Sequence, residues 1–229
     1  MKRFLITAMM LWNLIFGNDA SAQDWANKAF YAQANSELMS CSDDPQRVVL
    51  MGNSITEFWM ETHPQFFTDN HLVGRGISGQ VSTQMLARFR QDVLNLHPRV
   101  VVINCGTNDI AENNGTYDED ITMDNITSMT ELAINNGITV VLTSVLPCNR
   151  FLWNPSVRNV AGKIHSLNER IVALSQKMSL PYVDYFSSMV FNEEGAINPG
   201  YSEDGVHPNA TGYLVMERLL LECLGKLNP

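Results

Sequence analysis

Cysteine is scarce in this sequence and follows no metal-binding spacing. The chain of 229 residues contains only four cysteines, and none of them forms a C-x-x-C pair: Cys41, Cys105, Cys148 and Cys223. The spacing excludes a zinc knuckle, and the count excludes a disulfide-rich scaffold. Cys105 lies in an apolar run, so we expect a small buried hydrophobe there and not a nucleophile. The sequence leaves the pairing of the four thiols open.

Basic residues are also few. Lysine and arginine together number 15 against 24 aspartates and glutamates, which gives a formal net charge of −9. Such an acidic surface repels phosphate groups. The composition therefore argues against nucleic acid or anionic lipid as a partner.

Long apolar runs are absent except near the start of the chain. Lys2-Arg3 is followed by an apolar stretch, residues 4–17, and then by Ala20-Ser21-Ala22. The stretch is too short to span a bilayer, and the small residues resemble a cleavage site, so we predict a secretory signal peptide over residues 1–22; a membrane anchor is the alternative. We expect residues 23–229 to form one domain, exported to the periplasm or outside the cell and not membrane-bound after cleavage.

The remaining sequence alternates between two kinds of segment. Continuous apolar runs predict strands covered on both faces, as in a parallel sheet; these runs are 47–52, 71–75, 99–105, 139–146 and 180–186. Helical spacing of apolar residues predicts helices over 24–39, 78–96, 118–136, 156–178 and 209–225. Ser78 is expected to cap the second helix, and Gly137 to end the third. The alternation predicts a doubly wound α/β fold with right-handed crossovers.

Polar motifs follow the predicted strands where their carboxyl ends meet. The first strand leads into Gly52-Asn53-Ser54, the second into GRGISGQ (74–80) and the third into GTND (106–109), while DGVHPN (204–209) precedes the last helix. Ligand sites of doubly wound sheets lie at this edge. We therefore expect five residues to converge there: Ser54, Gly79, Asn108, Asp204 and His207.

These residue types suit acyl transfer. A serine hydroxyl becomes a nucleophile when a histidine takes its proton, and a carboxylate on the other ring nitrogen fixes the imidazole tautomer. A glycine N–H and an asparagine amide can donate hydrogen bonds to the oxyanion of the tetrahedral intermediate. No second glycine follows Ser54, so this is not the G-x-S-x-G elbow of α/β-hydrolases.

The motifs GNSIT, GRGISGQ, GTNDI and DGVHPN resemble blocks I, II, III and V of the SGNH, or GDSL, hydrolases, and they occur in the same order. The resemblance covers essentially all of residues 23–229. It implies a flavodoxin-like, three-layer α/β/α fold with a five-stranded parallel sheet. It also implies esterase or lipase chemistry without metal or organic cofactor, often on acetyl groups of carbohydrates.

The resemblance also implies residue roles. Ser54 would be the nucleophile, His207 its base and Asp204 the residue that orients the imidazole. The oxyanion hole would consist of the N–H groups of Ser54 and Gly79 and the side chain of Asn108. One departure is Asn53, which stands where the family motif has aspartate; the position lies outside the triad.

Plain structural roles compete with the nucleophile and base assignments. Ser54 with Glu57 three residues later forms S-x-x-E, the pattern of a helix capping box. His207 before Pro208 could be an exposed residue preceding a helix cap at Asn209.

The remaining site residues have alternatives as well. Gly76 is the alternative oxyanion donor to Gly79, and Glu203 is the alternative partner of the imidazole. A simple Asx turn would explain Asn108. Asp109 is expected to be structural, accepting backbone amides near the site.

Four large side chains are candidates for the substrate pocket. Arg75, between two glycines, would either contact substrate or brace a loop. Trp59, Phe151 and Trp153 are candidate walls, since aromatic rings suit sugar faces and acyl groups, although large aromatics are more often core. Trp153 lies in a polar, proline-bounded segment after the fourth strand, where site loops occur.

The sequence thus predicts an exported serine esterase that cleaves short-chain, above all acetyl, esters of carbohydrates. Export would place it among extracellular glycans, and no long lid segment offers a lipid surface. A small-molecule or glycan ester is the expected partner, with no metal and no cofactor. The alternatives are a lysophospholipase, thioesterase or arylesterase using the same residues, or a carbohydrate-binding protein without turnover.

Overall fold

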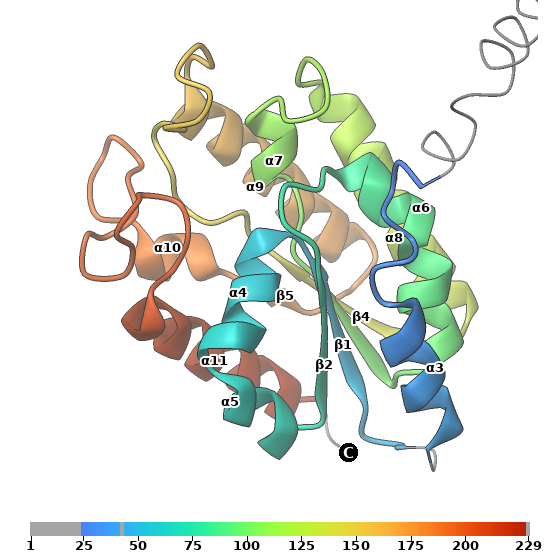
Figure 1. The fold of residues 1–229 in the computed structure, drawn as a ribbon. Helices are drawn as coiled ribbons and strands as arrows, with labels where there is room; N and C mark the ends of the chain where they lie inside the picture. The colour runs from blue at the N-terminus through green and yellow to red at the C-terminus, as the bar shows by residue number, and fades with distance from the viewer. Residues whose placement is uncertain (1–23, 42–43, 228–229) are drawn as a thin grey trace, which may run out of the picture.

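In the computed structural model, the described part of the chain forms a parallel sheet of five strands (Figure 1), in the order β2-β1-β3-β4-β5. The strands are β1 (Val48–Gly52), β2 (Leu72–Gly76), β3 (Val100–Ile103), β4 (Thr139–Thr143) and β5 (Tyr182–Val183). The structure describes residues 24–41 and 44–227, so the predicted signal peptide lies outside the described residues. This strand order is that of flavodoxin-like sheets, in which the order of strand addition switches from one side of β1 to the other, between β1 and β3.

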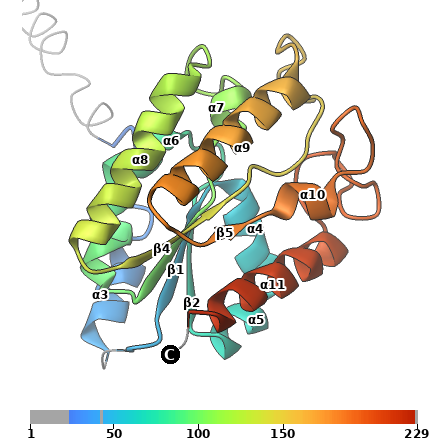
Figure 2. The ribbon, with the colours of Figure 1, turned by 180° about the vertical axis from the view of Figure 1, so that it is seen from behind.

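Side chains of each strand alternate between two apolar layers. One face packs on α6 (Ser82–Asp92), α8 (Glu119–Asn135) and α9 (Val160–Lys177) through Val49, Met51, Val101, Ile103, Val140 and Leu142. The other packs on α4 (Ser54–Thr62), α5 (Pro64–Asp69), α10 (Tyr185–Met189) and α11 (Ala210–Gly225) through Val48, Leu50, Val100, Val102, Val141 and Val183. Figures 1 and 2 show these helices on opposite sides of the sheet. The predicted three-layer α/β/α fold is confirmed.

Shorter helices complete the layers. The helix α3 (Ala32–Ser40) packs against α6 and against the short η1 (Leu94–Leu96), and α7 (Thr107–Ile110) contacts α9. Among the helices of residues 24–41 and 44–227, none combines the length and apolar character that a membrane crossing requires.

At two of the predicted helices, a capping side chain accepts hydrogen bonds from backbone amides of the first turn. The Asp118 carboxylate accepts hydrogen bonds from the amides of Asp120 and Ile121 at the start of α8. Asn209 accepts from the amide of Gly212 at the start of α11. After α8, Gly137 adopts φ +74°, the left-handed conformation that ends helices. Local sequence therefore determines both ends of α8.

Other boundaries were predicted wrongly. The first helix begins at Ala32 and not at 24, and the second begins at Ser82. Ser78 caps no helix, since its amide and hydroxyl both donate to the Glu57 carboxylate. The last strand is cut to two residues because the Asp184 side chain accepts from the Ser187 amide and starts α10.

The end of β2 approaches the first turn of α4 very closely. A Cβ atom at Gly76 would lie 2.4 Å from the Glu57 amide nitrogen and 2.5 Å from the Asn53 carbonyl oxygen. Both of these are backbone atoms, which cannot rotate away. Only glycine therefore fits at this position.

We expect Gly76→Ala to lower the free energy of unfolding by about 1–3 kcal/mol, because the added methyl group must push two backbone segments apart. Urea denaturation measures the change. Gly225→Ala is the matched control, since a Cβ there meets no atom within 4 Å, and it should leave stability unchanged or slightly raised. Equal stability of the Gly76 variant and the parent would contradict the close approach.

Candidate active site

Ser54 lies where the chain leaves β1 and enters α4. Asn53 caps that helix, its Oδ1 accepting from the Ile55 amide at 3.0 Å. Ser54 is therefore not the cap, and Glu57 completes no capping box because its carboxylate binds Ser78. The side-chain nitrogen of Asn53, Nδ2, is buried and has no hydrogen-bond partner among the described residues. The serine hydroxyl is thus left available for another contact.

That contact is His207. The Ser54 Oγ lies 2.9 Å from His207 Nε2, although 153 positions separate the two residues. The other ring nitrogen, Nδ1, lies 2.6 Å from Asp204 Oδ2. The structure thus brings serine, imidazole and carboxylate into one continuous hydrogen-bonded chain, and Asp204, not Glu203, is the carboxylate that touches the ring.

The Asp204 carboxylate is held in its charged form. Its Oδ1 accepts from the amides of His207 at 2.8 Å and Val206 at 2.9 Å. Partial burial acts to raise the pKa of Asp204, but the hydrogen bonds from the His207 ring and from these two amides outweigh it and lower the pKa below its usual value. An ionised carboxylate fixes the tautomer with the proton on Nδ1, which leaves Nε2 free to accept from serine.

The serine and histidine elements are also joined directly. The Tyr213 hydroxyl of α11 donates to the carbonyl oxygen of Ile55 in α4 at 2.9 Å. Trp59 of α4 stacks on the Tyr213 ring with centroids 5.6 Å apart. These contacts hold the helix that follows His207 against the helix that begins with Ser54.

The oxyanion candidates lie beside the serine. Gly79 has φ +77°, a conformation that favours glycine. The Asn108 amide is fixed at both ends: its Nδ2 donates to the carbonyl oxygen of Gln80 at 3.0 Å, and its Oδ1 accepts from Asn113 Nδ2 at 3.0 Å. Gly76, the alternative donor, is instead packed beneath α4.

A cavity of about 270 Å³ opens over these groups. It contains Ser54, Gly79, Asn108 and His207, and its other walls are Phe58, Ser78, Asn113 and Trp153. A larger cavity of about 430 Å³ lies between α10 and α11 and contains none of the predicted site residues. The smaller cavity is therefore the candidate site, because Ser54 and His207 line it and do not line the larger one.

Two aromatic rings flank the imidazole. The ring centroid of His207 lies 5.2 Å from that of Phe58 and 6.3 Å from that of Trp153. Trp153 is 47% exposed, and its Nε1 donates to Asn113 Oδ1 at 2.9 Å. Phe151 is buried behind Trp153, so it supports the wall from within.

Three of these wall residues were not predicted from the sequence: Phe58, Asn113 and Ser78, of which Ser78 was expected only to cap a helix. Phe58 could have been found, because it lies four positions after Ser54 on the same helix and therefore on the same side. Asn113, which bonds to both Asn108 and Trp153, belongs to no recognisable motif.

Arg75 does not belong to the cavity. It is 5% exposed, its Nε donates to Asn35 Oδ1 at 2.8 Å, and its guanidinium lies 4.7 Å from the ring centroid of Tyr31. The proposed substrate contact is therefore corrected: this arginine braces the segment that contains α3.

Trp59 is likewise not a pocket wall. It is 2% exposed, and its ring lies between those of Phe66 and Tyr213. Its Nε1 donates to the Glu217 carboxylate at 3.1 Å. The prediction that Trp59 lines the pocket is therefore wrong, and its role is to pack α4 against α11.

Asp109 has the structural role that was expected. Both of its carboxylate oxygens accept from the Ser82 amide at 3.0 Å, at the start of α6. Burial raises the pKa of Asp109 and the hydrogen bonds from Ser82 oppose that rise. Over residues 24–41 and 44–227, no group of histidine, cysteine or acidic side chains is arranged to hold a metal ion, and all four cysteines are free.

Several solved structures are similar to this chain. A candidate acylhydrolase from Bacteroides fragilis NCTC 9343 has 54% sequence identity and a TM-score of 0.87, covering 89% of this chain and 98% of its own. A GDSL-like lipase from Bacteroides thetaiotaomicron VPI-5482 has 51% identity and a TM-score of 0.86, covering 89% and 99%. An acetylxylan esterase from Geobacillus stearothermophilus shares the fold at 16% identity and a TM-score of 0.62, covering 79% and 94%. No curated protein matches this chain.

A family model matches residues 50–215, from within β1 to within α11. The matched span contains Ser54, Gly79, Asn108, Asp204 and His207. With the five-stranded parallel sheet and the two close structural relatives, this match shows that the chain belongs to the GDSL-like lipase/acylhydrolase family and is a hydrolase of ester bonds.

Proposed function

We propose that this protein is a serine esterase in which Ser54 attacks the ester carbonyl and His207 acts as the base. The observation that carries the proposal is the continuous chain from Ser54 Oγ through the imidazole to the Asp204 carboxylate, with its serine end on a cavity. Distances of 2.9 and 2.6 Å allow proton transfer without rearrangement.

In the first half of the reaction, Ser54 Oγ bonds to the carbonyl carbon while its proton moves to His207 Nε2. The imidazolium then gives this proton to the leaving alcohol, and an acyl-enzyme forms. In the second half, His207 takes a proton from water while the water oxygen attacks the acyl carbonyl carbon. The imidazolium then returns this proton to Ser54 Oγ as the bond between Oγ and the acyl carbon breaks, which releases the carboxylic acid and restores the serine hydroxyl. Asp204 remains ionised and stabilises the imidazolium in both halves.

The negative charge of each tetrahedral intermediate would be met by the amides of Ser54 and Gly79 and by Asn108 Nδ2. Asn108 is suited to this task because its amide is already oriented by Gln80 and Asn113, so no reorganisation accompanies the reaction. Preorganised donors of this kind contribute about 3–4 kcal/mol each to lowering the barrier.

The cavity favours a short acyl group on a sugar. Its volume of about 270 Å³ leaves little room for a long acyl chain, and the exposed Trp153 ring offers a flat apolar surface of the kind that stacks on sugar rings. The acetylxylan esterase activity belongs to a structure of only 16% identity, so the cavity and its wall are what support this substrate class. We further propose that the protein is exported, by means of residues 1–22.

Ser54→Ala should lower kcat for p-nitrophenyl acetate by about 1000-fold or more, because no other hydroxyl lies within reach of His207 Nε2 among the described residues. The same variant should resist covalent labelling by a fluorophosphonate, which reacts only with an activated serine. Ser188→Ala, on the exposed side of α10, serves as the control and should keep both properties. Parental turnover in the Ser54 variant would remove the mechanism, and a wild-type protein that resists labelling would indicate a binding protein without turnover.

Activity should fall on acidification, because a protonated imidazole cannot accept the serine proton. Asp204 should lose its charge only below the pH range usual for aspartate, since hydrogen bonds hold its pKa below the usual value. The measurement is kcat/KM against pH. A flat profile, or an acid limb that requires two protons, would count against this assignment.

Trp153→Ala should raise KM for acetylated oligosaccharides by about 3- to 10-fold through loss of stacking, while kcat for p-nitrophenyl acetate changes little. Acetate release from a panel of acetylated polysaccharides and sialosides measures the first effect. Trp25→Ala removes a tryptophan of similar exposure, 43%, that does not line the cavity, and it should leave KM unchanged. Preference for long acyl chains, thioesters or aryl esters over acetylated sugars would favour one of the alternative activities instead.

A further inference from the structure

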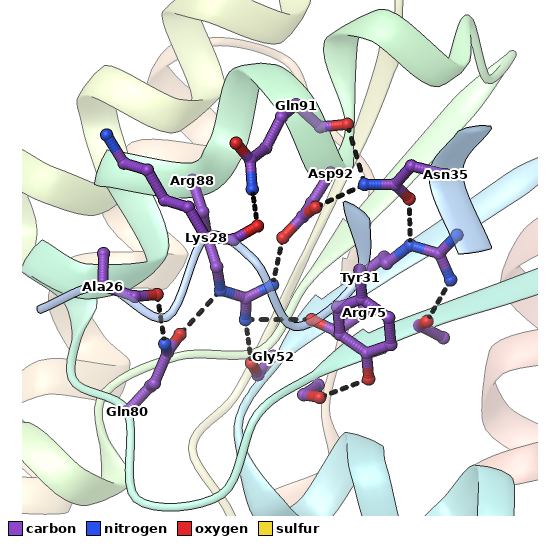
Figure 3. Close-up of polar contacts among 12 residues, drawn as sticks. Ala26, Lys28, Tyr31, Asn35, Gly52, Arg75, Gln80, Arg88, Gln91 and Asp92 are labelled. Carbon is purple, nitrogen blue, oxygen red and sulfur yellow. Dashed lines mark hydrogen bonds and ion pairs between the residues drawn. The ribbon is translucent and has the colours of Figure 1, made fainter. Parts of the chain in front are cut away.

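Arg88 is a fully buried cation on α6 that belongs to no motif found in the sequence. It is 0% exposed, and Figure 3 shows its guanidinium at the centre of a polar network between α6 and the sheet. Its NH1 donates to the Asp92 carboxylate at 2.9 Å. Burial lowers the pKa of Arg88 and the hydrogen bond to Asp92 opposes this shift. Burying a charge costs desolvation free energy, so we expect the N–H groups of this guanidinium to have a structural or functional role.

One guanidinium nitrogen joins the ends of β1 and β2. The NH2 group donates to the carbonyl oxygens of Gly52 and of Arg75, both at 3.0 Å. Gly52 ends β1 two residues before Ser54, and Arg75 lies four residues before Gly79. The separation of these two carbonyls fixes the separation of the two strand ends that supply the backbone donors of the oxyanion hole.

A third branch leads to the side-chain donor. The Nε of Arg88 donates to Gln80 Oε1 at 2.6 Å, and Gln80 Nε2 donates to the carbonyl oxygen of Ala26 at 2.7 Å. Gln80 is 4% exposed, and its backbone carbonyl accepts the Asn108 amide. The position of Gln80 therefore determines where Asn108 Nδ2 lies.

We propose that Arg88 is a positioning residue for the oxyanion hole, in that its guanidinium aligns Ser54, Gly79 and Asn108 through Gly52, Arg75 and Gln80. The inference rests on the proposed function, because it concerns the same three donors. Arginine suits the task because its planar head offers five N–H donors in fixed directions. Lysine carries the same charge but has one nitrogen, which cannot serve four acceptors that lie around a plane.

The first test is Arg88→Lys, assayed with p-nitrophenyl acetate. We expect kcat to fall by about 10- to 100-fold, less than the loss of a whole oxyanion donor, while KM stays within about twofold because the cavity walls are untouched. Unfolding is measured on the same samples. A folded Arg88→Lys enzyme with parental kcat would overturn the proposal.

A double-mutant cycle separates positioning from general stability. Asn108→Ala removes the donor through which Arg88 partly acts, so the combined variant should lose less activity than the product of the two single losses, by about threefold or more. Losses that multiply independently would show that Arg88 does not act through the oxyanion hole.

Asn168→Leu is the matched control. Asn168 of α9 is also buried, and it bonds to the backbone of Val145 beyond the end of β4, which carries no oxyanion donor. It should lower stability but keep kcat. A kcat loss equal to that of Arg88→Lys at the same loss of stability would overturn the proposal.

If Arg88→Lys does not fold, Gln80→Leu decides the question, because it removes the side-chain link but keeps the backbone carbonyl that binds Asn108. It should lower kcat without raising KM, and parental kcat would overturn the proposal. Failure of the proposed function is recognised separately, by Ser54→Ala turning over at the parental rate whatever the Arg88 variants do.

Discussion

The close approach of β2 to the first turn of α4 is the constraint on which the site depends. Gly76 lies directly beneath the backbone of Asn53 and Glu57, so the chain that leaves β2 must pass beside the residue that starts α4. Ser54 and Gly79 are neighbours for this reason, although they belong to different crossover units. A side chain at position 76 would separate the nucleophile from its oxyanion donor.

The two aspartates near the site, Asp204 and Asp109, differ in exposure and in their hydrogen-bond partners. Asp204 lies near the surface, where hydrogen bonds keep it ionised for the imidazole. Asp109 is half-buried close by, and its carboxylate accepts from the Ser82 amide at the start of α6, so it does not compete for His207. Two carboxylates near one site thus have separate tasks because their partners differ.

The sequence was sufficient for the sheet and for the residues that converge on its edge. Continuous apolar runs located all five strands, and the turn-forming motifs placed Ser54 and His207 beside each other across 153 positions. The sequence was insufficient where a side chain could point either toward the pocket or into the interior. Arg75 lies within one motif and Trp59 follows another, yet both side chains are buried away from the cavity, because their packed neighbours Tyr31 and Tyr213 decide their direction.

Boundaries and supporting contacts were also beyond the sequence. Ser78 looked like a cap, but the Glu57 carboxylate, 21 positions away, binds it and delays the start of the helix. Arg88 showed no signal, because a lone arginine on a predicted amphipathic helix is usually solvated. Its burial depends on acceptors that only the folded sheet supplies.

The two halves of the proposed machinery come from opposite layers of the fold. Ser54 and His207 belong to the layer of α4 and α11, which Trp59 and Tyr213 hold together. The loop with Gly79 leads into α6, and Asn108 lies on α7, both packed on the other face. The nucleophile and the two other oxyanion donors, Gly79 and Asn108, therefore depend on two separate apolar cores. Contacts between the two layers are needed to hold these groups at fixed positions relative to one another. The Arg88 guanidinium makes such a contact, because it extends from α6 and donates to the carbonyl oxygen of Gly52, at the end of the strand that leads into Ser54.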